Sequence, residues 1–169
     1  LDVAVALRNQ PLVFEKGKVQ EVFNMNDLPP MTLTFSKTTS ATSSCVEAIQ
    51  NIAKMDSAGA KLLDEKMNFA AKVCVEGLKS GKIESVIEGI SLANKVFKSW
   101  NLYNNEMTEL ENLLYKQGAL AVKPIGSGLG GYLLSLWNEL PSSNFYDICL
   151  TSDHGCDYID GEKIQRNLA

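Results

Sequence analysis

The chain has 169 residues, of which 45% are hydrophobic and 21% are charged, and its formal net charge is −4. This length is enough for one domain with a real core. The negative charge argues against a large nucleic-acid interface, which needs a basic surface. No apolar run approaches the roughly 18 residues that indicate a membrane span.

The first 30 residues predict short strands followed by a turn. Residues 1–7 are apolar and β-prone, residues 11–15 follow a polar turn, and residues 18–23 alternate apolar and polar side chains. Together they predict two or three antiparallel strands. Residues 24–30 are rich in Asn, Asp and Pro, which is typical of a turn or linker.

The next segment, residues 31–117, predicts one strand and four helices. Residues 31–35 alternate as a strand, and residues 37–44 are rich in Ser and Thr, whose hydroxyls cap helices. Apolar residues then recur at helical spacing as far as residue 53, and again over 57–79, 83–100 and 106–117. Four residues could begin the first helix: Thr38, Thr39, Ser40 or Thr42. The apolar stripe of the predicted helix over 57–79 contains Leu62, Leu63, Phe69, Val73 and Cys74. That of the helix over 83–100 contains Val86, Ile87, Ile90, Ala93 and Phe97, and that of the helix over 106–117 contains Met107, Leu110, Leu113 and Leu114.

Three further strands are predicted in the last third of the chain, over residues 119–125, 132–137 and 145–150. The tail beyond residue 153 is polar. This order of elements predicts an α+β domain in which the helices pack on one face of an antiparallel sheet.

A glycine-rich stretch, KPIGSGLGG from Lys123 to Gly131, lies between two of these predicted strands. It holds four glycines within six residues, more than a two-residue hairpin turn needs. Glycine permits positive φ and close approach, and successive N–H groups in such a turn can bind an anion. A plain glycine-rich hairpin is the competing interpretation. The stretch matches neither the phosphate loop GxxxxGK[ST] nor a dinucleotide fingerprint, which opens a helix.

The cysteines favour no metal site. None of them forms a CxxC pair, and a zinc site needs four ligands at regular spacing. We therefore expect no bound metal, reduced thiols and a cytoplasmic location. The four are Cys45, Cys74, Cys149 and Cys156.

The run KPIGSGLGGYLLSL resembles the third motif of the GHMP kinases, a pattern close to K-x-T-G-A-G-x-G-G-C followed by a strand. Five positions match: Lys123, Gly126, Gly128, Gly130 and Gly131. Three differ: Ile125 stands for Thr, Ser127 for Ala and Tyr132 for Cys.

Three other stretches resemble the same family, and mevalonate kinases most closely. The opening LDVAVALRNQPLVFEKG places Asp2 on the family's catalytic Asp, although Asn9-Gln10 replaces the usual Gly-Gly. The stretch LTFSKTTSATSSCVEAI places Thr42 on the family's Thr. The helix containing Asn94 is similar to the one that precedes the third motif.

The resemblance implies ATP-dependent phosphorylation of a small alcohol in isoprenoid precursor metabolism. Asp2 would orient or deprotonate the attacking hydroxyl, while Mg²⁺ and a Lys would neutralise phosphate charge. The backbone of the glycine loop would line the cleft. The implied substrate- and phosphate-binding residues are Thr42, Gly126, Ser127, Gly128, Gly130 and Gly131.

The family's second motif, similar to P-x-x-x-G-L-x-S-S, is absent. ATP and Mg²⁺ would therefore bind mainly to an N-terminal kinase domain, and the chain alone is expected to be inactive. On this interpretation residues 1–23 are strands of that domain, 24–30 a linker and 31–169 the C-terminal-type domain.

Two alternatives stay open. One is another GHMP member, namely a phosphomevalonate kinase, a diphosphomevalonate decarboxylase or a sugar kinase. The other is a diverged, non-catalytic binding module. The expected partners are a small-molecule substrate and the N-terminal domain, without nucleic acid or membrane, and a homodimer is left open.

Overall fold

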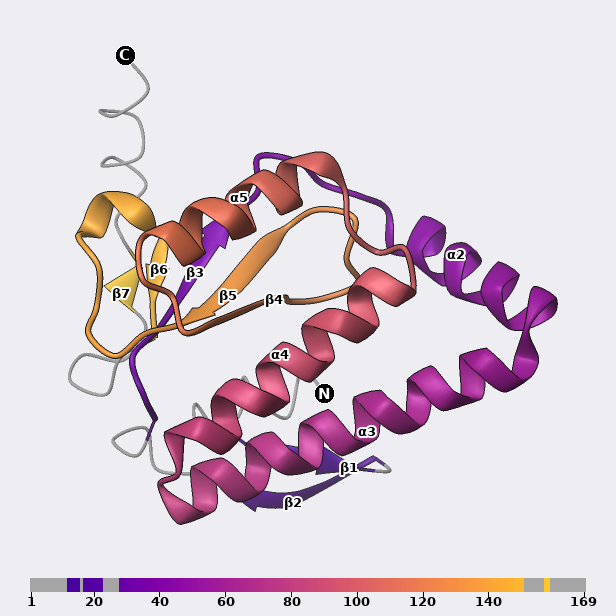
Figure 1. Ribbon diagram of the computed structural model, residues 1–169, viewed down its shortest axis with the longest axis horizontal. Helices are drawn as coiled ribbons and strands as arrows, with labels where there is room; N and C mark the ends of the chain where they lie inside the picture. Colours follow the sequence, from indigo (N-terminus) through magenta and orange to yellow (C-terminus); the bar gives the residue numbers. More distant parts are fainter. Residues whose placement is uncertain (1–11, 16, 23–27, 151–156, 159–169) are drawn as a thin grey trace.

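A computed structural model of the chain describes residues 12–15, 17–22, 28–150 and 157–158 (Figure 1). This part contains four α-helices and two antiparallel sheets, which confirms the α+β class. The strand predicted over 1–7, the candidate catalytic Asp2 and nearly all of the polar tail lie outside the described residues.

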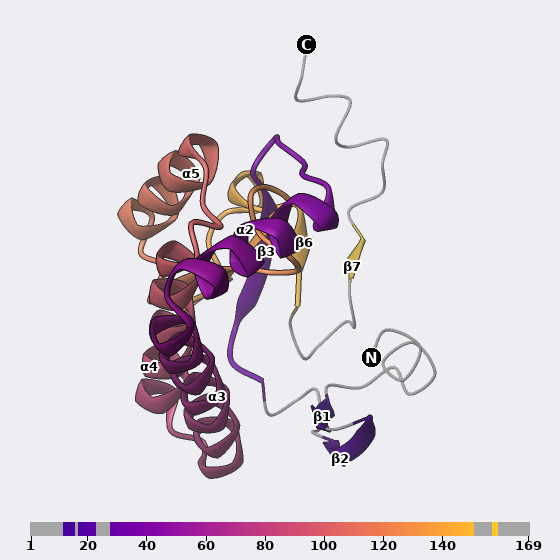
Figure 2. The same cartoon turned by 90° about the vertical axis from the view of Figure 1, so that its right-hand side faces the viewer.

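Two strands near the start form a sheet of their own. β1 (Leu12–Glu15) pairs antiparallel with β2 (Lys18–Val22), close to the predicted bounds. Gly17 lies in the turn between them at φ 80°. Among the described residues, no ladder joins this hairpin to the larger sheet, and Figure 2 shows β1 and β2 apart from the strands of that sheet.

The larger sheet has the order β4-β5-β3-β6-β7, with every neighbouring pair antiparallel (Figure 1). The strand predicted over 145–150 keeps only two residues in the ladder, because the preceding residues form a 3-10 helix, η2 (Ser143–Phe145). The strands are β3 (Met31–Phe35), β4 (Ala121–Pro124), β5 (Tyr132–Leu136), β6 (Ile148–Cys149) and β7 (Asp157–Tyr158).

The four predicted helices are confirmed, with ends within a few residues of expectation. Asp56 caps α3 by accepting the Gly59 N–H at 2.8 Å, and Gly81 ends that helix in the left-handed region. The helices are α2 (Thr42–Met55), α3 (Ser57–Ser80), α4 (Ile83–Ser99) and α5 (Asn105–Lys116). No helix in the described part of the chain is long and apolar enough to cross a membrane.

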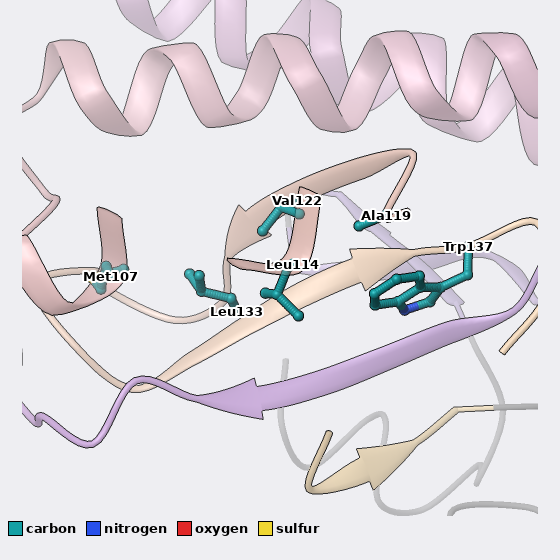
Figure 3. Close-up of a cluster of buried hydrophobic side chains, with 6 residues drawn as sticks. All are labelled: Met107, Leu114, Ala119, Val122, Leu133 and Trp137. Carbon is teal, nitrogen blue, oxygen red and sulfur yellow. The ribbon is translucent and has the colours of Figure 1, made fainter. Parts of the chain in front are cut away.

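The helices cover both faces of β4 and β5, so the expectation of a single covered face is wrong. Val122 packs with α5 in one buried cluster (Figure 3), whereas Ala121 packs with α4 in another. Consecutive strand residues point to opposite faces, so the two clusters lie on opposite sides. Figure 1 shows α5 and α4 on either side of β4 and β5. Ala121 and Val122 are both fully buried, so β4 is covered on both faces at these positions.

Helix α3 packs on α4 through small residues. Ala60, Ala70 and Gly77 are its buried positions. A Cβ added to Gly89 of α4 would lie 2.7 Å from the Ala70 carbonyl oxygen, so the two backbones are in close contact. Leu62 and Phe69, which were expected in the buried stripe, are 51% and 57% exposed. Close approach through small residues leaves the larger side chains outside the contact.

Candidate functional site

The glycine stretch forms the loop between β4 and β5, and all four of its glycines have positive φ. The angles are 72° at Gly126, 89° at Gly128, 144° at Gly130 and 81° at Gly131. Leu129, at 56°, also lies in the left-handed region. Residues with a Cβ rarely adopt such angles, so the backbone conformation itself requires the glycines.

Two of these glycines are also needed for close packing. A Cβ at Gly128 would lie 2.8 Å from both Leu102 Cβ and the Leu102 carbonyl oxygen, and one at Gly130 would lie 2.8 Å from the Thr38 carbonyl oxygen. The N–H of Leu129 donates to Leu102 O at 2.8 Å. The loop is therefore held against the segment that follows α4 and the segment that follows β3.

Polar side chains fasten the loop from both of these segments. Ser40 Oγ donates to the Gly128 carbonyl oxygen at 2.7 Å, and Cys45 Sγ reaches the same oxygen at 3.4 Å. Asn104 Nδ2 donates to Leu129 O at 3.2 Å and to Thr38 Oγ1 at 3.0 Å, while its Oδ1 caps α5. Sequence reasoning missed these roles. An Asn just before a helix signals a cap, but its long-range partners leave no local pattern.

These contacts decide which loop N–H groups are free to bind an anion. Leu129 N and Gly131 N are already bonded, the latter to Thr38 O at 2.8 Å. Within the described part of the chain, the N–H groups of Gly126, Ser127 and Gly130 have no acceptor. Gly126 is exposed. The loop can therefore offer a few backbone N–H donors, while its contacts with Ser40, Leu102 and Asn104 hold its backbone in place.

Lys123, the matched lysine of the glycine motif, is half-buried in β4. Its Nζ donates to Pro124 O at 2.7 Å and lies 5.6 Å from the centre of the Phe97 ring. Burial lowers the pKa of this amine, an effect that Cys74 partly opposes. The contacts of Lys123 are therefore to helix α4 and its own strand.

The remaining candidate residues are less well placed, or lie outside the described part. Thr42 is the exposed first residue of α2, and it is Ser40 that contacts the glycine loop. The helix begins at Thr42, one of the four residues predicted to start it, and the residue before it, Ala41, offers no side-chain cap. Asp2 lies outside the described residues. The described residues contain no group of three or more metal-ligating side chains, and the thiols of Cys45 and Cys74 are not in a disulfide.

A buried polar network links α4 to α5 beside the loop's support. Asn94 Nδ2 donates to Glu111 Oε1 at 2.6 Å, and Lys98 Nζ pairs with Glu111 Oε2 at 2.6 Å. Tyr103 Oη donates to Asn94 Oδ1 at 2.6 Å. Burial, and secondarily the Glu111 carboxylate, raise the pKa of Tyr103. Because Tyr103 lies between Leu102 and Asn104, the network fixes the segment on which the loop rests.

No protein-family model matches the chain, and no curated protein matches it by sequence. The chain is similar in structure to mevalonate kinase from L. major, solved in complex with R-mevalonate. The two superpose with a TM-score of 0.64 over 79% of this chain, at 15% sequence identity. The match covers 40% of that enzyme, so this chain spans less than half of its length. The described chain has a GHMP-like fold.

Proposed function

We propose that this chain is the C-terminal part of an ATP-dependent GHMP kinase that phosphorylates a small alcohol, as mevalonate kinases do. The observation that carries the proposal is the glycine loop. It has four positive-φ glycines and is held by Ser40 and Asn104, and among the described residues the N–H groups of Gly126, Ser127 and Gly130 have no acceptor. The GHMP-like fold supports the same conclusion.

The proposed chemistry divides between this chain and a preceding half. Phosphoryl transfer depends mainly on positioning and on neutralising charge. The free loop N–H groups would face the substrate and the transferred phosphate, and Asp2 would act as the base toward the substrate hydroxyl. The proposal assigns the residues that hold ATP and Mg²⁺ to an N-terminal domain, because no P-x-x-x-G-L-x-S-S run occurs among the 169 residues. We propose that the protein acts in the cytoplasm.

The test is ATP-coupled turnover, with mevalonate and a panel of small alcohols, by the longer protein that carries this chain. Asp2→Asn should lower kcat by roughly a hundredfold or more, the usual scale of acid–base catalysis. Its free energy of unfolding should stay within about 0.5 kcal/mol of the wild type. Full activity in Asp2→Asn would remove the catalytic assignment.

A second outcome would favour the non-catalytic alternative. If the longer protein lacks a P-x-x-x-G-L-x-S-S helix and turns over none of the alcohols, the chain is a binding module that has kept a GHMP-like fold.

The proposed role of Thr42 is tested in the same assay. Thr42→Ala should raise KM with little change in kcat if Thr42 contacts substrate. Ser43→Ala, at the neighbouring exposed position of α2, is the matched control.

A further inference from the structure

Three strands end side by side at the glycine loop. Ile125 N donates to Tyr132 O at 3.1 Å, Phe35 is the register partner of Tyr132, and Ser36 N donates to Gly131 O at 2.9 Å. The residues just beyond these pairs therefore lie in one row across the ends of β4, β5 and β3. That row contains Gly126, Gly131 and the turn at residues 36–37, with adjacent strands about 4.8 Å apart.

The middle of this row is bare main chain. Gly126 and Gly131 have φ of 72° and 81°, and a Cβ added to either would meet no atom within 4 Å. Their neighbours Gly128 and Gly130, in contrast, are packed against other segments. Because nothing fills the space at Gly126 and Gly131, a ligand can approach the backbone closely there.

Lys37 borders this bare surface. It is exposed and has φ of 62°, a conformation that residues with a Cβ disfavour. Hydrogen bonds on both sides hold it there: Ser36 N donates to Gly131 O, and Gly131 N donates to Thr38 O. Such strained positions gather at functional sites.

Lys37 is also a cation without an ion-pair partner among the residues that the structure describes. The Asp147 carboxylate, held at the end of β3, accepts the Phe35 N–H. Lys123 is engaged with Pro124 O and the Phe97 ring.

We propose that Lys37 supplies the positive charge for a phosphoryl group held against the bare backbone at Gly126 and Gly131. The proposal rests on the proposed function of the loop and adds a residue to it. A lysine ammonium acts toward phosphate as a mobile point charge, so an exposed side chain at the rim suits the role.

The test is a titration of the ¹⁵N-labelled 169-residue chain with inorganic pyrophosphate, and in parallel with mevalonate, followed by amide chemical shifts. In the wild type, pyrophosphate should shift most strongly the amides of Gly126 and Ser127, whose N–H groups have no acceptor among the described residues. Lys37→Asn removes the charge but tolerates the left-handed backbone, and it should weaken pyrophosphate binding about tenfold. Lys37→Arg should restore most of the affinity. Lys72→Gln, which removes an exposed charge on α3, should have no effect.

The outcomes separate this inference from the proposed function. Pyrophosphate shifts that are unchanged in Lys37→Asn would overturn the role of Lys37 and leave the loop as an anion site. Shifts with mevalonate alone would overturn the phosphoryl assignment, since the bound anion would then be the carboxylate. An absence of loop shifts with either titrant would overturn the inference together with the loop's part in the proposed function.

Discussion

Ser40 and Gly128 lie 88 residues apart in the chain, yet the Ser40 hydroxyl donates a 2.7 Å hydrogen bond to the Gly128 carbonyl oxygen. Ser40 precedes α2 by two residues, so this bond ties the start of a helix to the middle of the glycine loop. Gly128 itself has φ of 89° and lies against Leu102, so its position also depends on the segment that follows α4. The loop conformation and its supports are therefore mutually dependent.

Gly128→Ala should destabilise the chain by about 2–5 kcal/mol. The added Cβ would carry about 1–2 kcal/mol of left-handed strain, and its overlap with Leu102 adds the ~1–3 kcal/mol typical of overpacking. Gly118→Ala is the matched control, because Gly118 has φ of 97° and open space around it. Urea unfolding of both variants measures the difference, and equal losses would mean that the Leu102 contact carries no weight.

Two buried hydroxyls in the core under α5 should respond in opposite directions. The Trp137 Nε1–H donates to Thr32 Oγ1 at 2.8 Å. Thr32→Val would leave this buried indole N–H without an acceptor and should lower the free energy of unfolding by about 1–3 kcal/mol. Ser135 Oγ has no hydrogen-bond partner among the described residues, so Ser135→Ala should be neutral or stabilising. Thermal unfolding tests both, and a large loss in Ser135→Ala would show that this hydroxyl has a partner.

The buried amine of Lys123 should leave a signature in the pH dependence of stability. Burial puts its folded-state pKa below the ordinary 10.5, so the unfolded state holds the proton more tightly. The resulting penalty is complete below the lowered pKa and disappears as pH rises through it toward 10.5. The wild type should therefore gain stability relative to Lys123→Met over that window. Both proteins are measured in a Cys74→Ala background, because Cys74 interacts with Lys123. A pH-independent difference would contradict the assignment.

Much of the fold could be predicted from local pattern. The stripe from Val86 to Phe97 rests on spacing and residue type within a few positions, and the structure confirms it. The glycines of the loop were identified in the same way, because positive φ is a local demand. Periodicity also identified β4 as a strand, but it does not tell which side of a strand is covered. The cover on both faces of β4 was missed for that reason.

The supports of the site were not predictable, because their partners are distant in the chain. Ser40 in a Ser/Thr-rich run looks like a helix cap, yet its acceptor is on the loop. The exposure of Phe69 depends on Gly89 and Ala70 meeting across two helices, and nothing in either helix alone reveals that contact. The motif lysine, Lys123, matched by position, while its burial depends on Phe97 of α4.

The Asn104 side chain both caps α5 and holds the glycine loop, and substitution can separate these two roles. Its Oδ1 caps α5 at Met107 N, and its Nδ2 holds Leu129 O and Thr38 Oγ1. Asn104→Ser keeps a good capping residue but loses both donations, so it should cost about 1–2 kcal/mol. Asn104→Ala also loses the cap and should cost about 1 kcal/mol more. Urea unfolding gives both values.

Hydrogen exchange shows which part of the chain loses stability in Asn104→Ser. The amides of Leu129 and Gly131 are bonded to the segments that Asn104 holds in place, at Leu102 O and Thr38 O. If Asn104 fastens the loop, these two amides should exchange faster in Asn104→Ser by more than the global loss of stability explains, because the loop would open locally. The amide of Leu133, within β5, should follow the global change only. Equal acceleration at all three would mean that Asn104 stabilises the domain as a whole and has no particular hold on the loop.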